Sequence, residues 1–542
     1  MPSRNSVAIR VHADRPTGAY QPIWNWFGYD EPNYTYTKHG KKLLGELAAL
    51  SPEPVRVRAH NLLTSGDGTP ALKWGSTNAY TEDRFGNPVY DWAIMDRIFD
   101  AYVEAGTMPF IQVGFTPQAL SDHQGPYRHH FSPADQTSTI TTGWAAPPKD
   151  LAKWGGLVEA WASHLADRYG YERVASWPWE VWNEPDGHYW TGTIAQFCAM
   201  YDVTAAAIKR VLPKARVGGP HTCGAFENER AANFLREFLR HCVSGTNAAT
   251  GKVGSPLDFV AFHAKGAPVL HQNHVRMGVR RHLCNIDANI AIMKEFPELR
   301  GLTAILGESD PEGCAACSAR YTPRNGYRNG PLYGAYVVET IMRTYELSRR
   351  TGIAIEGAVT WAFLFEDQPY FDGFRDLATN GIDKAVLNAF RMLGMLGGNW
   401  VEAKSSHALA IGQIMEEGVR GPPDVNAVAT RDEKGVSILL WHYHDDDEQG
   451  DAAQIALAMD GWRRASASLR HYRMDGEHSN AFAAWKAMGS PDVIEGEDYK
   501  RLEAAGRLAR LDAPASVAAT GGTVEFRTSL PRQGVSLLRF EW

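Results

Sequence analysis

Two glutamates in this sequence stand where apolar runs end. Glu184 lies in the motif Trp182-Asn183-Glu184-Pro185 after a tryptophan-rich run, and Glu308 ends the run of residues 302–308. Two carboxylates about 5 to 5.5 Å apart can cleave a glycosidic bond with retention, one as nucleophile and one as acid and base. The alternative is that Asn183 and Glu184 only cap the next helix.

The apolar runs must bring these two glutamates together. Eight such runs alternate with segments whose apolar residues recur at helical spacing. Strict alternation to a count of eight favours a closed (β/α)8 TIM barrel, in which the strand ends all face one way. Glu184 and Glu308, on the fourth and seventh strands, then meet across the barrel mouth. The predicted strands are residues 21–29, 54–60, 108–115, 178–186, 215–221, 257–263, 302–308 and 357–365, and the predicted helices are residues 38–50, 91–105, 150–169, 193–212, 227–242, 279–296, 330–350 and 384–396.

The pattern of apolar and polar residues changes after residue 400. Short alternating segments separated by Gly, Asp and Pro are typical of a β-sandwich, and residues 6–13 alternate in the same way. We predict an N-terminal strand at 1–18 that pairs with the sandwich, a catalytic barrel at 19–400 and a β-sandwich domain at 401–542. The predicted sandwich strands are residues 408–415, 424–431, 436–443, 454–459, 466–474, 523–528 and 534–540, with helical interruptions at 479–487 and 499–505.

Composition excludes several functional classes. The chain has 542 residues, of which 44% are hydrophobic and 22% charged, as in a globular protein. A net charge of −7 without a Lys- or Arg-rich block argues against nucleic-acid and membrane partners. No run approaches the roughly 20 apolar residues of a membrane span, and the N-terminus lacks the apolar core of a signal peptide. We expect a cytoplasmic protein, or a periplasmic one if a signal was removed, and a homo-oligomer is compatible with the sequence.

The six cysteines are too few and too scattered for a disulfide framework. Cys314-Ala-Ala-Cys317 has the spacing of half a zinc site, but no second close pair supplies the other two ligands. A local disulfide and two core thiols both remain open for this pair. Because no HxH or DxH pair stands at a strand end, we expect no metal ion and no other cofactor, which argues against a metal-dependent barrel hydrolase.

Several motifs together resemble one family of retaining (β/α)8 glycosidases. The Asn-Glu-Pro motif on a fourth strand, with a glutamate on the seventh, is similar to a large clan of such enzymes. Within this clan the chain resembles glycoside hydrolase family 39, which contains β-xylosidases and α-L-iduronidases, and the resemblance spans most of the chain. The supporting stretches are Phe27-Gly28-Tyr29, Val57-Arg58-Ala59-His60, the residues 179–186, Phe262-His263-Ala264-Lys265-Gly266 and Glu308-Ser309-Asp310-Pro311.

The resemblance implies roles for the residues at the predicted strand ends. Glu184 would be the acid/base and Glu308 the nucleophile, and the charge of Glu308 is expected to raise the pKa of Glu184. His221 stays open, and Glu180 is expected to be a structural carboxylate in a lower layer. The implied sugar-binding residues are Asn183 at the 2-hydroxyl, His60 and His263 around the innermost sugar, Trp361 as an apolar platform, Lys265 and Glu366. For the two histidines and Trp361 the alternative is an ordinary place in the core.

Two departures from the β-xylosidase pattern bear on the substrate. Lys265 stands where those enzymes tend to have an aromatic hydroxyl, and Ser309-Asp310-Pro311 replaces an aromatic residue after the nucleophile. Both features resemble the iduronidase branch, in which Lys265, helped by Arg375, would bind a sugar carboxylate. Lys265 is equally expected as an ion-paired loop residue. We expect an exo-acting β-D-xylosidase that releases xylose from xylo-oligosaccharides, with an α-L-iduronidase-like uronidase as one alternative and a non-catalytic sugar-binding barrel as another.

Overall fold

A closed barrel of eight parallel strands forms the centre of the molecule in a computed structural model, which describes residues 6–135, 141–512 and 514–542. The strand order is β12-β13-β2-β3-β6-β7-β8-β9, and β9 pairs back onto β12. All eight predicted strands are present, most of them shorter than predicted. Their bounds are β2 (Trp26–Tyr29), β3 (Arg56–Ala59), β6 (Met108–Val113), β7 (Trp179–Val181), β8 (Val217–Thr222), β9 (Phe259–Lys265), β12 (Thr303–Asp310) and β13 (Ile355–Trp361).

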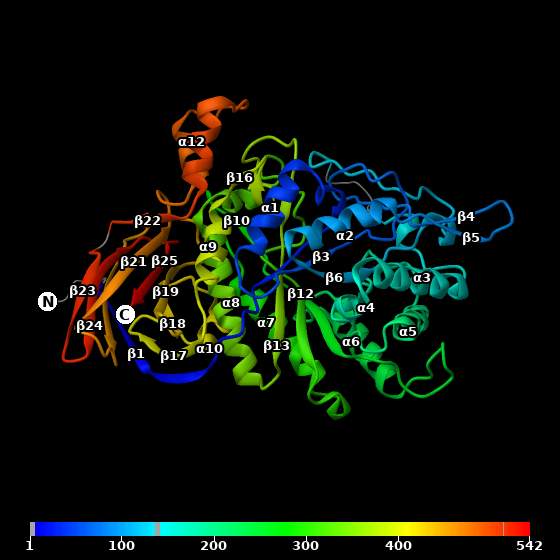
Figure 1. The fold of residues 1–542 in the computed structure, drawn as a ribbon, viewed down its shortest axis with the longest axis horizontal. Helices are drawn as coiled ribbons and strands as arrows, with labels where there is room; N and C mark the ends of the chain where they lie inside the picture. Colours follow the sequence, from blue (N-terminus) through cyan, green and yellow to red (C-terminus); the bar gives the residue numbers. More distant parts are fainter. Residues whose placement is uncertain (1–5, 136–140, 513) are drawn as a thin grey trace.

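Helices surround this barrel (Figure 1), so its strands are buried on both faces and read as apolar runs. Local signals fix where several helices begin: Thr37 caps the first one, and Thr193 and Gln196 form a capping box on another. The eight predicted helices are confirmed as α1 (Lys38–Ala48), α2 (Ala93–Ala105), α3 (Leu151–Tyr169), α5 (Ile194–Val211), α6 (Glu229–Ser244), α7 (Val279–Met293), α8 (Pro331–Thr351) and α9 (Ala385–Leu393), and a short α4 (Tyr171–Ala175) follows α3.

The loops at the carboxyl ends of the strands carry small elements of their own. The loop after β3 contains a β4–β5 hairpin, the loop after β9 contains a β10–β11 hairpin, and the loop after β13 forms a three-stranded sheet of β14, β15 and β16. The bounds are β4 (Tyr80–Glu82), β5 (Pro88–Tyr90), β10 (Val269–His271), β11 (His274–Arg276), β14 (Phe363–Phe365), β15 (Asp376–Thr379) and β16 (Ile382–Asp383), and the 3-10 helices are η1 (Pro32–Tyr34), η2 (Gln118–Leu120), η3 (Gly143–Ala145), η4 (Pro297–Leu299) and η5 (Pro323–Asn329).

A second sheet lies at one end of the molecule and packs against α8 and α9 of the barrel (Figure 1). Its order is β22-β21-β23-β24-β20-β1-β17-β18-β19-β25, and β21 also pairs with β25. The N-terminal strand joins this sheet between β17 and β20. The bounds are β1 (Ser6–Ala19), β17 (Asn399–Ser405), β18 (Asp424–Arg431), β19 (Gly435–Tyr443), β20 (Ala453–Asp460), β21 (Ser466–Met474), β22 (Ala509–Leu511), β23 (Ser516–Thr520), β24 (Thr523–Leu530) and β25 (Val535–Glu541).

One predicted strand of this region is wrong. Residues 408–415 contribute to a helix, α10 (Ile411–Glu417), whose buried side chains Ile411 and Ile414 lie one turn apart. Both predicted helical interruptions are present as α11 (Ala481–Ala487) and α12 (Gly496–Gly506). Hydrogen bonding joins the strands into one sheet, so a division into two packed sheets stays a prediction. Within the described ranges, no helix has the length and apolar character needed to cross a bilayer.

Candidate active site

Glu184 and Glu308 lie at the barrel mouth on opposite sides of His263. Glu184 follows β7, where its backbone N–H donates to the His221 carbonyl at 2.9 Å, and its φ of 41° places it in the left-handed region. Glu308 lies within β12 in register with His263 of β9. A non-glycine residue with positive φ costs free energy and is often found at functional sites. The chain therefore holds Glu184 in a strained position that points its carboxyl group into the barrel mouth.

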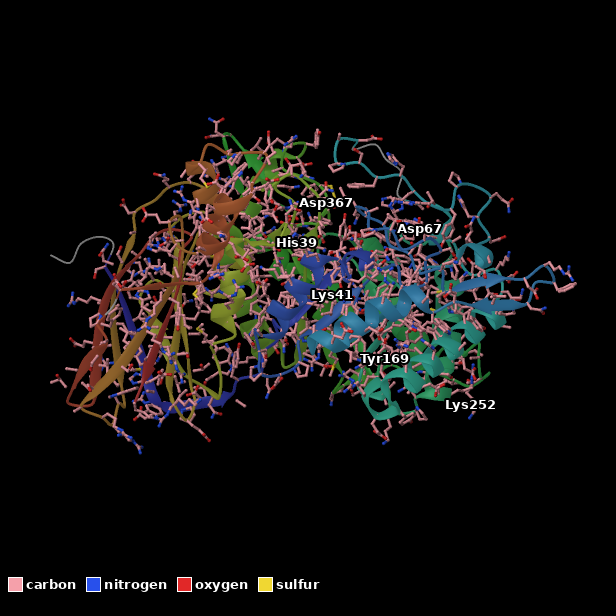
Figure 2. All side chains as sticks on the ribbon, turned by 45° about the horizontal axis from the view of Figure 1, so that its top comes forward. His39, Lys41, Asp67, Tyr169, Lys252 and Asp367 are labelled. Atoms are coloured by element: carbon pink, nitrogen blue, oxygen red, sulfur yellow. A yellow bond between two sulfur atoms is a disulfide. The ribbon has the colours of Figure 1, made fainter. Side chains whose placement is uncertain are left out.

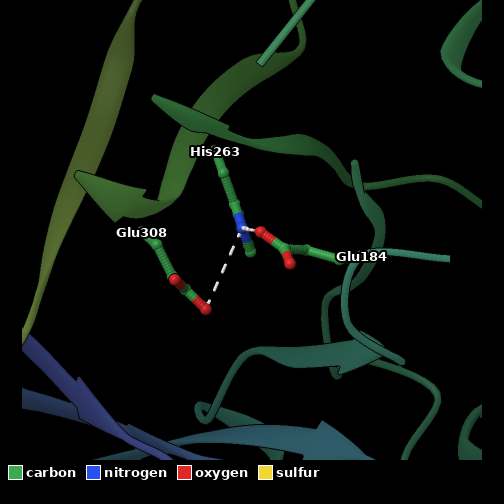
Figure 3. Close-up of side chains that lie close together, drawn as sticks. All are labelled: Glu184, His263 and Glu308. Carbon is green, nitrogen blue, oxygen red and sulfur yellow. Dashed lines mark hydrogen bonds and ion pairs between the residues drawn. The ribbon is translucent and has the colours of Figure 1, made fainter. Parts of the chain in front are cut away.

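The two carboxyl groups are close enough to act on one glycosidic bond. His263 Nδ1 lies 2.9 Å from Glu184 Oε1 and 3.9 Å from Glu308 Oε1 (Figure 3). One oxygen of each carboxylate and the His263 nitrogen all lie within 4.8 Å of one another. This separation suits a retaining pair, since inverting enzymes hold their carboxyl groups about 6.5 to 9.5 Å apart to admit a water. Glu184 is the more accessible of the two, with 21% of its side chain exposed against 5% for Glu308.

A fully buried arginine, Arg58 of β3, links Glu308 to the neighbouring side chains of the barrel interior. Its guanidinium donates to Glu180 Oε1 at 2.5 Å, to Asn183 Oδ1 at 2.9 Å and to Glu308 Oε1 at 3.3 Å. The sequence analysis did not single out this residue. The sequence contained a signal for this role: Arg58 lies two residues before His60 on the same strand, so both side chains point to the same face, the barrel interior.

Glu180 and His221 are in contact in the layer beneath, and both are fully buried; burial lowers the pKa of His221 to about 3, so this is a contact between a carboxylate and a neutral imidazole. This agrees with the expected structural role of Glu180. Gly307 must be a glycine here, because a Cβ at this position would collide with the His221 ring. The absence of a side chain lets β12 pass close to His221 and turn Glu308 toward the mouth.

His60 is oriented by a carboxylate that the sequence analysis missed. Its Nδ1 lies 2.7 Å from Asp30 Oδ1, and Lys73 forms an ion pair with the same carboxylate. His60 Nε2 has no hydrogen-bond partner in the described part of the chain and lies 3.8 Å from Glu308 Oε1. The Trp361 ring is 1% exposed, with its centroid 4.2 Å from that of His60 and the Arg58 guanidinium carbon 4.8 Å away. The structure thus places His60 beside Glu308 and Trp361 beside His60 and Arg58.

Lys265 is an ion-paired residue. Its ammonium group pairs with Glu308 and lies 2.9 Å from Asp310 Oδ2, since β9 and β12 place these residues in register. Arg375 is also paired with protein groups, donating to Glu312 Oε1 at 2.8 Å and to the Trp361 carbonyl at 3.1 Å, while its Nη2 lies 3.7 Å from Asp310 Oδ2 and makes no hydrogen bond within the described ranges.

Glu366 lies outside this cluster in the described chain. Its carboxylate is 3.9 Å from His39 Nε2 on α1, and Figure 2 shows His39 beside Asp367, the next residue. It makes no hydrogen bond or ion pair with the other predicted site residues within the described ranges. Its assignment as a sugar ligand stays a prediction.

The electrostatics differ from expectation at Glu184. Burial and the Glu308 charge raise the pKa of Glu184, but the hydrogen bond and charge of His263, together with the Lys265 charge, lower it by a larger amount, so the pKa lies below its usual value. The predicted rise is therefore wrong. Burial also raises the pKa of Glu308, yet Lys265, His263 and Arg58 lower it well below its usual value. The structure keeps Glu308 ionised, as a nucleophile requires.

Comparisons with known proteins agree with the geometry. The chain is 25% identical over 468 residues to a β-xylosidase of Geobacillus stearothermophilus, covering 84% of this chain and 81% of the relative. It is 25% identical over 390 residues to an α-L-iduronidase of Canis lupus familiaris, covering 66% and 55% of the two chains. A monomeric β-xylosidase from Caulobacter crescentus CB15 has a similar fold, with a TM-score of 0.76 at 23% identity over 98% of this chain and 99% of that one. A family model matches residues 8–524, and the chain therefore belongs to glycosyl hydrolases family 39.

Proposed function

We propose that this protein is a retaining, exo-acting β-D-xylosidase that releases xylose from the ends of xylo-oligosaccharides. The observation that carries the proposal is the pair Glu184 and Glu308, one carboxylate oxygen of each lying within 4.8 Å of the other. The similarity to a β-xylosidase over most of both chains supports the choice of sugar.

The proposed reaction has two displacements. Glu308 attacks the anomeric carbon and forms an ester with it, while the glycosidic bond breaks and Glu184 gives its proton to the departing oxygen. A water then attacks the same carbon, Glu184 takes its proton, and Glu308 leaves as a carboxylate. Arg58 and Lys265 hold Glu308 ionised for the first step. Glu184 must carry a proton at that point, so the bound substrate has to weaken the His263 contact that lowers its pKa.

Two further residues are proposed to bind the sugar through atoms that the protein leaves free. Asn183 Oδ1 is bound by Arg58, so its amide N–H groups are directed toward the sugar 2-hydroxyl. Asp30 fixes His60 Nδ1, which leaves Nε2 as the acceptor for another hydroxyl. We propose Trp361 as the apolar platform, since it supports both His60 and Arg58.

Charge balance favours a xyloside over a uronide. Lys265 and Arg375 are the two cations that would hold a sugar carboxylate, and both already face protein carboxylates. The carboxylates around them are Glu308, Asp310 and Glu312. Arg58 also pairs with Glu308 and with Glu180, and Arg328 pairs with Glu312, so four carboxylates face four cations. A further carboxylate on the substrate would lack a free cation. The iduronidase alternative retains the support of Lys265 itself and of the iduronidase relative.

A panel of aryl glycosides tests this proposal. The wild type should hydrolyse aryl β-D-xyloside with a far higher kcat/KM than aryl α-L-iduronide, and Glu308→Ala should abolish turnover of both. Glu184→Ala should slow substrates with poor leaving groups far more than nitrophenyl substrates, and azide should restore rate by entering the vacated space. If the wild type prefers the iduronide, the proposed substrate is a uronide and not a xyloside. If Glu184→Ala loses rate equally on poor and good leaving groups and azide does not restore it, Glu184 is not the acid/base.

We also propose that the chain is divided into two domains. The barrel occupies residues 19–400, and the segments 1–18 and 401–542 together form a β-sandwich. The buried side chains of its strands, such as Val7, Ile455 and Val436, make a core cluster separate from that of the barrel. Limited proteolysis that releases a folded C-terminal fragment together with the N-terminal strand would support this division.

A further inference from the structure

Two features outside the catalytic cluster could bind a ligand or undergo chemistry. The first is the disulfide of Cys314 and Cys317, which decides between the two alternatives left open for this pair. Both cysteines line one cavity at the barrel mouth together with Glu184, so the disulfide belongs to the site already described. The second feature is a larger cavity of about 880 Å³, which lies at the other end of the barrel.

This larger cavity lies between the floor of the barrel and the second sheet. Arg56, Thr303 and Ile355 are the first residues of β3, β12 and β13, so the barrel contributes the amino ends of its strands. Residues 17–23, the second half of α8, β17 and β18 form the other walls. The catalytic glutamates lie at the carboxyl ends of the strands, as in other (β/α)8 barrels. Ligand sites of roughly 300 to 1,000 Å³ are common between domains, and this cavity has such a size and place.

Most of the wall is apolar, and one aromatic ring is partly exposed in it. Trp400 of β17 packs edge-to-face against Tyr20 and Tyr345, with ring centroids 4.9 and 5.1 Å away. These contacts hold the indole in place before a ligand arrives. Aromatic rings prefer edge-to-face or offset-stacked neighbours, so this wall fits a flat aromatic body. Apolar side chains that also line the cavity are Ile23, Met342, Ile355, Val401 and Val428.

A partly buried cation, Arg56, lines this cavity without an ion-pair partner. It lies two residues before Arg58 on β3, so its side chain also points to the barrel interior, here at the floor. Its guanidinium carbon is 4.6 Å from the centroid of the Trp26 ring, and the side chain makes no hydrogen bond or ion pair in the described part of the chain. Burial lowers the pKa of this guanidinium. A partly buried charge without a partner costs free energy, which a bound anion would recover.

The two carboxylates that attract this guanidinium do not neutralise it. Glu356 of β13 is bound by Arg216, whose Nη1 and Nη2 donate to it at 2.6 and 2.8 Å. Glu53 is exposed at the rim and attracts Arg56 without forming an ion pair with it among the described residues.

The remaining charged residues of the wall leave this balance unchanged. Glu402 of β17 is held by Arg15 at 3.2 Å and by Lys404 at 2.6 Å. Arg349 of α8 is exposed and offsets the charge of Glu53. One positive charge therefore remains, that of the guanidinium at the barrel floor, and a ligand with one negative group matches it.

We propose that this cavity is a second binding site, separate from the active site, for a carboxylate with a flat aromatic body. The carboxylate pairs with Arg56 at the barrel floor, and the aromatic body lies against Trp400 and the apolar wall. Such a ligand contacts both the barrel and the second sheet, so its binding stabilises the junction between them. The catalytic pair at the other end of the strands stays free, and the proposal is independent of the reaction assigned to that pair.

Two probes of the same shape test the charge requirement, namely 2-naphthoate and its uncharged counterpart 2-naphthamide. Isothermal titration calorimetry should show saturable binding of 2-naphthoate with a Kd about 10-fold or more below that of 2-naphthamide, the value of one charge-assisted hydrogen bond. The carboxylate should also raise the unfolding temperature. Arg56→Gln should abolish the preference for the carboxylate, whereas Arg56→Lys, which keeps the charge, should retain part of it.

Three further variants locate the binding site. Trp400→Leu should weaken both probes by about 2- to 10-fold through the lost ring contact. Lys265→Met removes a cation at the barrel mouth, and Arg84→Gln removes an exposed one on the β4–β5 turn. Both of these control variants should bind 2-naphthoate as the wild type does.

Several results would overturn this second site. One is the absence of saturable 2-naphthoate binding to the wild type, and another is equal affinity for the two probes. A folded Arg56→Gln variant that still prefers the carboxylate would also overturn it, as would loss of binding in Lys265→Met, which would place the ligand at the barrel mouth. If Arg56→Gln does not fold, Trp400→Leu and Arg56→Lys decide, and wild-type affinity of both variants for 2-naphthoate would overturn the site.

Discussion

Replacing Lys265 with methionine should slow hydrolysis of every substrate that this enzyme accepts. The ammonium group bridges the Glu308 and Asp310 carboxylates, the latter at 2.9 Å. Asp310 is fully buried, and its other oxygen accepts from the Trp361 backbone N–H at 2.9 Å. Methionine keeps most of the length of the side chain but leaves both carboxylates without this cation.

The size of the effect follows from the lost contact with the nucleophile. A charge-assisted hydrogen bond contributes about 1.5 to 3 kcal/mol, which corresponds to about 10- to 150-fold in kcat/KM. The pH profile should change as well. Lys265 lowers the pKa of Glu308, and Glu308 must be ionised to attack. The variant therefore has a higher pKa at Glu308, and the acid limb of kcat/KM should move to higher pH.

The assay is kcat/KM against pH for aryl β-D-xyloside and aryl α-L-iduronide. Lys265→Arg, which keeps the charge, should leave the acid limb near its wild-type position, and Lys252→Met serves as control at an exposed lysine. The reasoning is refuted if Lys265→Met leaves the acid limb unchanged and loses rate on the iduronide alone. Lys265 would then bind a substrate carboxylate, and the uronidase alternative would replace the xylosidase.

Three other perturbations test separate parts of the site. His263→Asn removes the contact that lowers the pKa of Glu184, so the basic limb of kcat/KM for a poor leaving group should move to higher pH; an unmoved limb would contradict this. Gly307→Ala should lower stability by about 1 to 3 kcal/mol in thermal unfolding because its Cβ collides with the His221 ring, whereas Gly313→Ala meets no atom within 4 Å and should unfold like the wild type; equal stability of both would contradict the packing. Dialysis against EDTA should leave kcat/KM unchanged, and a loss reversed by Zn²⁺ would show that a metal takes part.

The barrel was predictable because its strands are buried on both faces. Such strands give unbroken apolar runs, and the helices between them have clear caps and periodicity. The strands of the second sheet were harder to predict from the sequence. Residues 408–415 fit a strand and a helix equally well over so short a run, because Leu409, Ile411 and Met415 alternate as in a strand, whereas Ile411 and Ile414 have the spacing of one helix face. The strand β17 was missed because Val401 is its only buried residue.

The positions of Glu184 and Glu308 at the barrel mouth were predictable for a different reason than their surroundings. Glu184 and Glu308 follow apolar runs, which is a local signal. The partner of Lys265 depends on the register of β9 against β12, and no local pattern shows that register. The sign of the Glu184 pKa shift was missed because it depends on His263 as well as on Glu308.

Covalent trapping tests the central assignment most directly. A 2-deoxy-2-fluoro-β-D-xyloside with a good leaving group should inactivate the enzyme, and peptide mass spectrometry should find one xylosyl group on Glu308. An NMR time course with the ordinary xyloside should show the β-anomer of xylose first. A label on any residue other than Glu308, or the α-anomer as first product, would contradict the retaining mechanism proposed for this pair.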